Sequence, residues 1–160
     1  TMLDLPCGDW SWMSKVDLTG IEYIGGDIVD NIIISNRKNY LNSNCKFQTL
    51  DLINDDLPKV DLIFVRDCLV HFEEKQIKSA IDNVIRSGST FFATTIHRKC
   101  GKNLDSSNAD RWRKINLNID PYGLKDPIYL LDDRYPENGV DEDKYVGVWR
   151  IDEMQLLSKN

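Results

Sequence analysis

The chain has 160 residues, of which 41% are hydrophobic and 29% are charged, as is usual for a soluble globular domain. Acidic residues outnumber basic ones by 26 to 20, and the net charge of −6 argues against a general nucleic-acid-binding protein because it repels a phosphate backbone. No stretch is long and apolar enough to cross a bilayer and no signal peptide opens the chain, so we expect a cytoplasmic protein without a membrane partner.

The first segment, Met2–Trp12 (MLDLPCGDWSW), predicts a strand that runs into a ligand-binding loop. The apolar run reaches Asp4 and then a Pro-Cys-Gly-Asp turn. Gly8 permits a positive φ or a close approach of the backbone to a ligand, and Asp9 can cap a following helix. Because the strand begins at once, we expect one domain spanning residues 1–160 that lacks an N-terminal helical cover.

Strand and helix patterns then alternate at short intervals, which favours parallel strands joined by crossovers. Asp30 can cap the first of the two expected helices, and Gly88 can end the second, whose apolar residues share one stripe. The expected strands are Ile21–Asp27, Lys46–Leu50, Val60–Val65 and Thr90–Ile96, and the expected helices are Asp30–Leu41 and Glu73–Arg86.

The last third of the chain changes character. Two polar or acidic stretches, Lys99–Arg113 and Asp132–Lys144, are expected to be loops. Ile128–Leu131 and Tyr145–Ile151 read as a hairpin-like pair of strands, which adds an antiparallel edge to the sheet. The sequence therefore predicts an α/β fold with a doubly wound, mostly parallel sheet.

Acidic residues recur where the expected strands end. The carboxyl ends of parallel strands meet at one edge of a sheet, and ligands bind there. Aspartate at a strand end or helix cap has a purely structural explanation when taken singly, but its repetition here favours a binding site. The residues concerned are Asp4, Asp9, Asp27, Asp51 and the pair Arg66 and Asp67.

The loop after the first strand does not fit a dinucleotide. That ligand needs a Gly-x-Gly-x-x-Gly turn to reach its pyrophosphate, whereas Pro6 replaces the first glycine and Trp10 follows Gly8 by two positions. A ligand with ribose hydroxyls and positive charge fits better.

S-adenosylmethionine (SAM) has these features. Asp27 can accept hydrogen bonds from two ribose hydroxyls, and Asp4 can favour the cationic end together with Asp9. Ile28 and Leu52 can sandwich the base, and the carboxylate of Asp51 can accept a hydrogen bond from its exocyclic amine.

Four motifs, LDLPCGDW, GGDI, TLDL and RDCLVHF, resemble those of class I SAM-dependent methyltransferases, in the order and spacing of that family. The first motif and the late VGVWRI segment are similar to an uncharacterised branch of it. The resemblance implies a seven-stranded Rossmann-like sheet with an antiparallel edge strand and SAM as cofactor. It implies cofactor contacts at Asp4, Pro6, Cys7, Gly8, Asp9, Trp10, Asp27, Ile28, Asp51, Leu52, Arg66 and Asp67.

The function expected from these motifs is methyl transfer to a small-molecule acceptor, with oxygen as the target. The alternative is a non-catalytic nucleotide-binding or protein-interaction domain on the same fold. His71 is the candidate base because histidine titrates near neutral pH, although it could instead pack as a semi-buried residue; His97 is placed less well. Arg66 and Asp67 can hold the methionine moiety or shape the acceptor site, or either can simply pair with a neighbour.

Aromatic and basic residues raise further possibilities. Trp112 is the expected acceptor contact, whereas Trp12 and Trp149 are expected to fill core gaps. The basic cluster beside Trp112, made of Arg111, Arg113 and Lys114, is interpreted as a solvated face in preference to a functional patch.

The four cysteines do not predict a disulfide framework or a metal site. Cys7, Cys45, Cys68 and Cys100 form no Cys-x-x-Cys pair, and neither histidine stands at a ligand spacing from them. We therefore expect reduced thiols and no bound metal.

Overall fold

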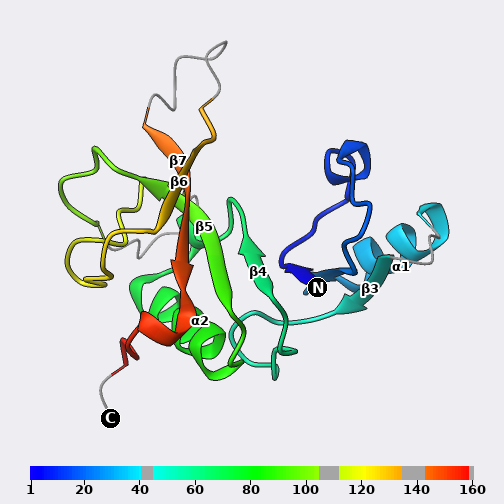
Figure 1. Cartoon of the computed structure of the whole chain (residues 1–160), viewed down its shortest axis with the longest axis horizontal. Helices are drawn as coiled ribbons and strands as arrows, with labels where there is room; N and C mark the ends of the chain where they lie inside the picture. Colours follow the sequence, from blue (N-terminus) through cyan, green and yellow to red (C-terminus); the bar gives the residue numbers. More distant parts are fainter. Residues whose placement is uncertain (41–44, 105–111, 135–142, 159–160) are drawn as a thin grey trace.

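A seven-stranded mixed sheet forms the centre of the molecule (Figure 1). The computed structural model describes residues 1–40, 45–104, 112–134 and 143–158. The strand order is β3-β2-β1-β4-β5-β7-β6. The strands are β1 (Met2–Asp4), β2 (Tyr23–Asp27), β3 (Cys45–Thr49), β4 (Leu62–Val65), β5 (Phe91–His97), β6 (Tyr129–Asp132) and β7 (Lys144–Arg150).

The sheet confirms the predicted α/β class. Strands β1 to β5 pair in parallel, β7 runs antiparallel to β5, and the edge strand β6 pairs antiparallel with β7. Asp4 pairs in register with Gly25. Asp27 lies two residues further along β2 and therefore on the same face as Asp4, at the carboxyl edge of the sheet.

Helix α2 (Glu74–Arg86) covers one face of the sheet. Its apolar stripe, which includes Ile77 and Ile81, packs with Leu3 of β1 and Phe92 of β5. The helix begins with a capping box in which the backbone N–H of Glu73 donates to the side chain of Gln76 at 2.9 Å. Gly88 follows it with φ +63°, as expected for a terminating glycine.

Helix α1 (Asp30–Asn39) packs beside β2 and β3 at the opposite end of the molecule from β6 and β7 (Figure 1). Its residue Ile33 belongs to a second buried cluster with Trp10, Tyr23 and Phe47. The expected C-terminus of this helix, Leu41, lies outside the described residues. No helix in the described part of the chain is both long and apolar enough to span a membrane.

Two helix-capping expectations are wrong. No α-helix follows the first loop: Asp9 instead accepts a hydrogen bond from the backbone of Ser11 at 3.0 Å, and only a short 3₁₀ turn, η1 (Met13–Lys15), comes next. Asp30 is already the first residue of α1, and its carboxylate accepts a bond from the hydroxyl of Thr49.

The other face of the sheet carries an open apolar hollow of about 440 Å³. Its described lining residues come from strands or from residues 12–21, among them Phe64, Ala93 and Val148. Trp12 lies at this hollow and is 43% exposed, so the expectation that it fills the core is wrong, whereas Trp149 is buried as expected. Among the described residues, an α-helix therefore covers the centre of the sheet on one face only.

Candidate functional site

The loop after β1 is held against the end of β2. The backbone N–H of Cys7 donates to the carbonyl of Gly26 at 2.7 Å, and that of Gly8 donates to Oδ2 of Asp27 at 3.2 Å. Gly8 has φ +54°, the conformation anticipated for it. Nδ2 of the buried Asn36 binds the Gly8 carbonyl at 2.7 Å. Sequence reasoning missed Asn36, since a single polar residue within a helix carries no distinctive pattern.

Asp27 is a buried carboxylate at the carboxyl edge of the sheet. Its Oδ1 accepts from the backbone of Val29 at 2.9 Å, while Oδ2 accepts from Gly8. A carboxylate has about four acceptor positions, so both oxygens retain capacity for further donors. The two backbone bonds also fix the orientation of the carboxylate toward any ligand that reaches this edge.

A pocket of about 270 Å³ lies beside this loop. Four of the predicted site residues line it together: Pro6, Ile28, Asp51 and Leu52. Its other described lining residues were not anticipated: Leu5, Leu50, Ile53, Asn54, Cys68, Phe72 and Gln76. The volume is slightly below the range of about 300–1,000 Å³ usual for whole small-molecule sites. The pocket therefore suits one apolar portion of a larger ligand, such as a base.

The carboxylate of Asp51 is already engaged in its own turn. Oδ1 accepts from the backbone of Ile53 at 2.8 Å and of Asn54 at 3.3 Å, and Oδ2 accepts from Nδ2 of Asn54 at 2.8 Å. These bonds shape the wall of the pocket next to Leu52. Ile28 also lines the pocket and is 63% exposed.

Asp4 is buried and receives a hydrogen bond from the phenol of Tyr23 at 2.5 Å. Burial raises the pKa of Asp4 to about 7, against the opposing effects of the Tyr23 bond and of the positive charge of Arg66. Asp4 therefore changes its charge near neutral pH, directly before the loop that carries Pro6, Gly8 and Asp9.

Two side chains of the loop point into the protein. The Trp10 ring lies within 5.4 Å of the Tyr23 ring and 5.3 Å of the Phe47 ring, centroid to centroid. Cys7 is buried in the same cluster, and burial raises the pKa of its thiol to about 12. Trp10 and Cys7 therefore anchor the loop from within, whereas Asp9 is on the surface.

Four charged side chains form a closed arrangement, the ion ring, at the ends of β4, β6 and β7. Arg66 contacts Asp67 at 3.2 Å and Asp133 at 3.0 Å, and Lys144 contacts the same two acids at 2.7 and 3.2 Å. Asp67 has φ +52°, and its N–H donates to Oγ1 of Thr95 at 2.9 Å. The alternative that Arg66 and Asp67 pair with neighbours is thus what the structure shows.

The two histidines differ in placement. His71 is exposed in the 3₁₀ turn η2 (Leu69–His71), so the semi-buried alternative is wrong, and the next residue, Phe72, lines the pocket. His97 is fully buried, and its Nδ1 accepts from the backbone of Ile115 at 3.3 Å. The ring of Trp112 lies 5.7 Å from that of His97. Of the two histidines, only His71 is therefore exposed to solvent.

The basic cluster beside Trp112 is not simply a solvated face. Lys114 Nζ contacts the buried Asp143 at 2.6 Å. The terminal guanidinium nitrogens of Arg113, Nη1 and Nη2, are buried and have no hydrogen-bond partner among the described residues. Arg111 lies outside the described residues.

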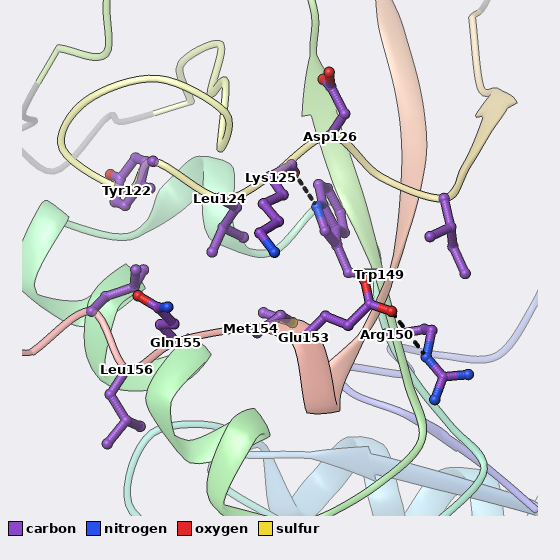
Figure 2. A pocket seen from close by; sticks show the side chains of 13 residues that line it. Tyr122, Leu124, Lys125, Asp126, Trp149, Arg150, Glu153, Met154, Gln155 and Leu156 are labelled. Atoms are coloured by element: carbon purple, nitrogen blue, oxygen red, sulfur yellow. Dashed lines mark hydrogen bonds and ion pairs between the residues drawn. The ribbon is translucent and has the colours of Figure 1, made fainter.

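A separate pocket of about 200 Å³ lies near the start of β5 and the end of β7 (Figure 2). Trp149 and Arg150, which line it, pair with Phe92 and Phe91 at the start of β5, away from the carboxyl ends. Nε1 of Trp149 donates to the carbonyl of Lys125 at 2.8 Å.

All four cysteines are free thiols.

No family model matches the chain, and no curated protein matches it. Several solved structures share its fold. Human N-acetylserotonin methyltransferase in complex with SAM has a TM-score of 0.52 at 17% identity, and the match covers 60% of this chain and 29% of that one. Magnesium protoporphyrin IX methyltransferase from Synechocystis PCC 6803 with bound S-adenosylhomocysteine (SAH) has a TM-score of 0.52 at 19% identity, covering 62% and 48%.

A third structure with this fold is the cyclase SpnF, with a TM-score of 0.51 at 18% identity and coverage of 64% and 41%. The chain thus spans less than two thirds of each of these proteins. The identities are low, so the likeness establishes the fold that these methyltransferases share, and the presence of a cyclase shows that the fold alone does not set the chemistry.

Proposed function

We propose that the chain binds SAM at the carboxyl edge of β1, β2 and β3 and transfers its methyl group to an oxygen of a small-molecule acceptor. The observation that carries the proposal is the juxtaposition of an apolar pocket with an oriented carboxylate. Pro6, Ile28 and Leu52 line the pocket, and Asp27 lies at the adjacent end of β2. Methyltransferases crystallised with SAM or SAH have the same fold.

The residues present fit the two ends of an adenosine group. The lining of the pocket is mostly apolar, as a flat base requires, and Ile28 and Leu52 would contact its faces. Asp27 holds Gly8 and Val29 in place and retains acceptor capacity for ribose hydroxyls. The loop around Gly8 is thereby fixed before a ligand arrives, which reduces the entropy cost of binding.

SAM supplies the activated methyl group, so the protein has to align the acceptor and remove a proton from it. His71 would accept the proton of the acceptor hydroxyl, because it is exposed beside the pocket residue Phe72. Asp4 and the loop side chains would act on the cofactor side. In this proposal the acceptor approaches from the ends of β4 and β5.

Calorimetric titration with SAM and SAH tests the binding step. Wild type should bind both ligands, and Asp27→Asn should weaken each at least about tenfold by removing charge-assisted bonds to the ribose. Asp56→Asn is a matched control, since Asp56 is an exposed aspartate that is not among the pocket residues. If wild type gave no heat of binding with SAM and none with SAH, the proposal would be refuted.

Turnover separates an enzyme from a non-catalytic nucleotide-binding domain. SAM consumption should be measured with a library of hydroxylated acceptors, in wild type and in His71→Ala. An active enzyme forms SAH with at least one acceptor, and the variant should keep SAM affinity while losing rate. Binding of SAM without turnover across hydroxyl and amine acceptors would favour the non-catalytic alternative.

A further inference from the structure

The segment around Arg113 lies at the carboxyl edge of the sheet, between β4 and β5. The backbone N–H of Arg113 donates to the carbonyl of Val70 at 3.1 Å, in the turn after β4. Two residues later, the carbonyl of Ile115 accepts from the backbone of His97, the last residue of β5, at 2.7 Å. Arg113 is therefore fixed on the side from which the proposed acceptor approaches.

The charged end of the Arg113 side chain is buried, which is the reverse of the usual arrangement. Long cationic side chains normally bury the stem and keep the charged head in water. Nη1 and Nη2 of Arg113 are buried, whereas the residue as a whole is half-buried, so its exposure lies on its other atoms. Burying a guanidinium head without an anion is costly, and such a group in a native protein calls for a missing partner.

The described acids near this edge are already bound to other cations. Asp143 accepts from Lys114 Nζ at 2.6 Å and from the backbone of Lys99 at 3.1 Å. Asp67 and Asp133 belong to the ion ring. Within residues 1–40, 45–104, 112–134 and 143–158, no carboxylate bonds to the Arg113 head. The described residues therefore supply no anion for this head.

We propose that Arg113 binds an anionic group of the methyl acceptor, a carboxylate or a phosphate, so that the substrates are acidic small molecules. This inference rests on the proposed methyl transfer. Arginine suits this role because its planar fork matches either anion with two parallel hydrogen bonds. The backbone bonds at Arg113 and His97 hold this segment in place, and binding of the anion by Arg113 would select the acceptor and position its hydroxyl.

The first test measures anion binding directly by thermal unfolding. Benzoate and inorganic phosphate serve as probes, with ionic strength held constant by sodium chloride, on wild type, Arg113→Met and the control Arg98→Gln. Arg98 is a more exposed arginine after β5 that is paired with Asp126 at 2.6 Å. At least one probe should raise the Tm of wild type and of the control, and that increase should be lost in Arg113→Met.

The same experiment distinguishes a ligand-binding arginine from a structural one. Without any probe, Arg113→Met should have a Tm equal to or above that of wild type, because it removes a buried charge that lacks an anion. The probe that produces the shift identifies the anion as carboxylate or phosphate. A lower Tm of the ligand-free variant, the absence of a shift in wild type, or an equal shift in Arg113→Met would each overturn the proposal.

The second test excludes the carboxylate of SAM as the anion. Calorimetry should compare SAM with 5′-methylthioadenosine, which lacks the aminocarboxylate group, in wild type and Arg113→Met. Affinities for both should change less than about twofold. A selective loss of SAM affinity would assign Arg113 to the cofactor instead. If wild type bound neither SAM nor 5′-methylthioadenosine, the proposed function would be refuted. The thermal-unfolding test with benzoate and phosphate would still decide whether Arg113 binds an anion.

Turnover gives the third readout with a matched pair of acceptors, 4-hydroxybenzoate and 4-hydroxybenzamide. Arg113→Met should lower kcat/KM at least about tenfold for the acid while leaving the amide nearly unchanged, and Arg98→Gln should affect neither. Equal losses for the acid and the amide would show that Arg113 does not recognise the charge of the acceptor.

Discussion

Tyr23 donates a hydrogen bond to Asp4 across two neighbouring strands, at 2.5 Å, and both side chains are buried. Burial raises the pKa of Asp4 to about 7 and keeps the Tyr23 phenol protonated by raising its pKa as well. The native state therefore retains a proton on Asp4 that the unfolded chain loses near its ordinary pKa of 3.8. Between these two values the native state binds more protons, so the free energy of unfolding falls as the pH rises.

Asp4→Asn should remove this pH dependence. We expect the free energy of unfolding to be higher than in wild type at about pH 8, by up to about 4 kcal/mol, and nearly equal at about pH 4. Urea unfolding at several pH values measures the difference. Asp56→Asn, at an exposed position, should follow wild type throughout. Parallel pH profiles of Asp4→Asn and wild type would show that Asp4 titrates normally.

Gly25 marks a close approach between β2 and its covering side chains. A Cβ at this position would lie 2.7 Å from Cδ1 of Phe47 and 3.1 Å from Sγ of Cys7. The Phe47 ring is itself packed against Trp10, at 5.3 Å between centroids, and has little room to move. Gly25→Ala should therefore lower the free energy of unfolding by about 1–3 kcal/mol.

Gly101→Ala is the matched control for that substitution, because an added Cβ at Gly101 meets no atom within 4 Å. Denaturant unfolding should place it within about 0.5 kcal/mol of wild type. If both variants lost the same stability, the cost would come from the backbone and not from the contact with Phe47.

Strands and helices were predictable where the pattern is local. The run at Val60–Val65 contains β4, and the apolar stripe ending near Gly88 is α2. The placement of Asp27 at the end of β2 also followed from the sequence. By contrast, the exposure of Trp12 depends on which face of the sheet lacks a helix, and no local pattern encodes that.

Contacts between distant segments could not be anticipated. Arg66 meets Asp133 across 67 positions, and Lys144 meets Asp67 across 77. The sequence marks each of these residues only as a charge in a loop or at a strand end. Arg113 looked like part of a solvated basic face for the same reason, since burial of its terminal nitrogens is decided by tertiary packing. Strands, helices and strand ends were therefore more predictable than contacts between distant segments.

The ion ring predicts a strong effect of removing Lys144. This side chain is buried and contacts two carboxylates, and Lys144→Met would remove one of the two cations that contact both of them in the ion ring. We expect the free energy of unfolding to fall by about 2–3 kcal/mol. This is a small loss for the removal of one partner of a buried ion pair, because Asp67 is partly exposed. Adding Asp67→Asn should recover part of the loss, and thermal unfolding of the single and double variants measures it. Additive losses would mean that Lys144 and Asp67 do not interact.

Ile28 offers the cleanest test of the pocket, because it lines the pocket yet is 63% exposed. Truncation to alanine removes apolar surface that a bound base would cover but costs the unliganded fold little. Ile28→Ala should weaken SAM binding about fivefold, which corresponds to about 1 kcal/mol of lost burial, without changing Tm. Ile34→Ala is the control, since Ile34 is 59% exposed and is not among the residues that line the pocket. Calorimetry that finds equal SAM affinity in the two variants would place the base elsewhere.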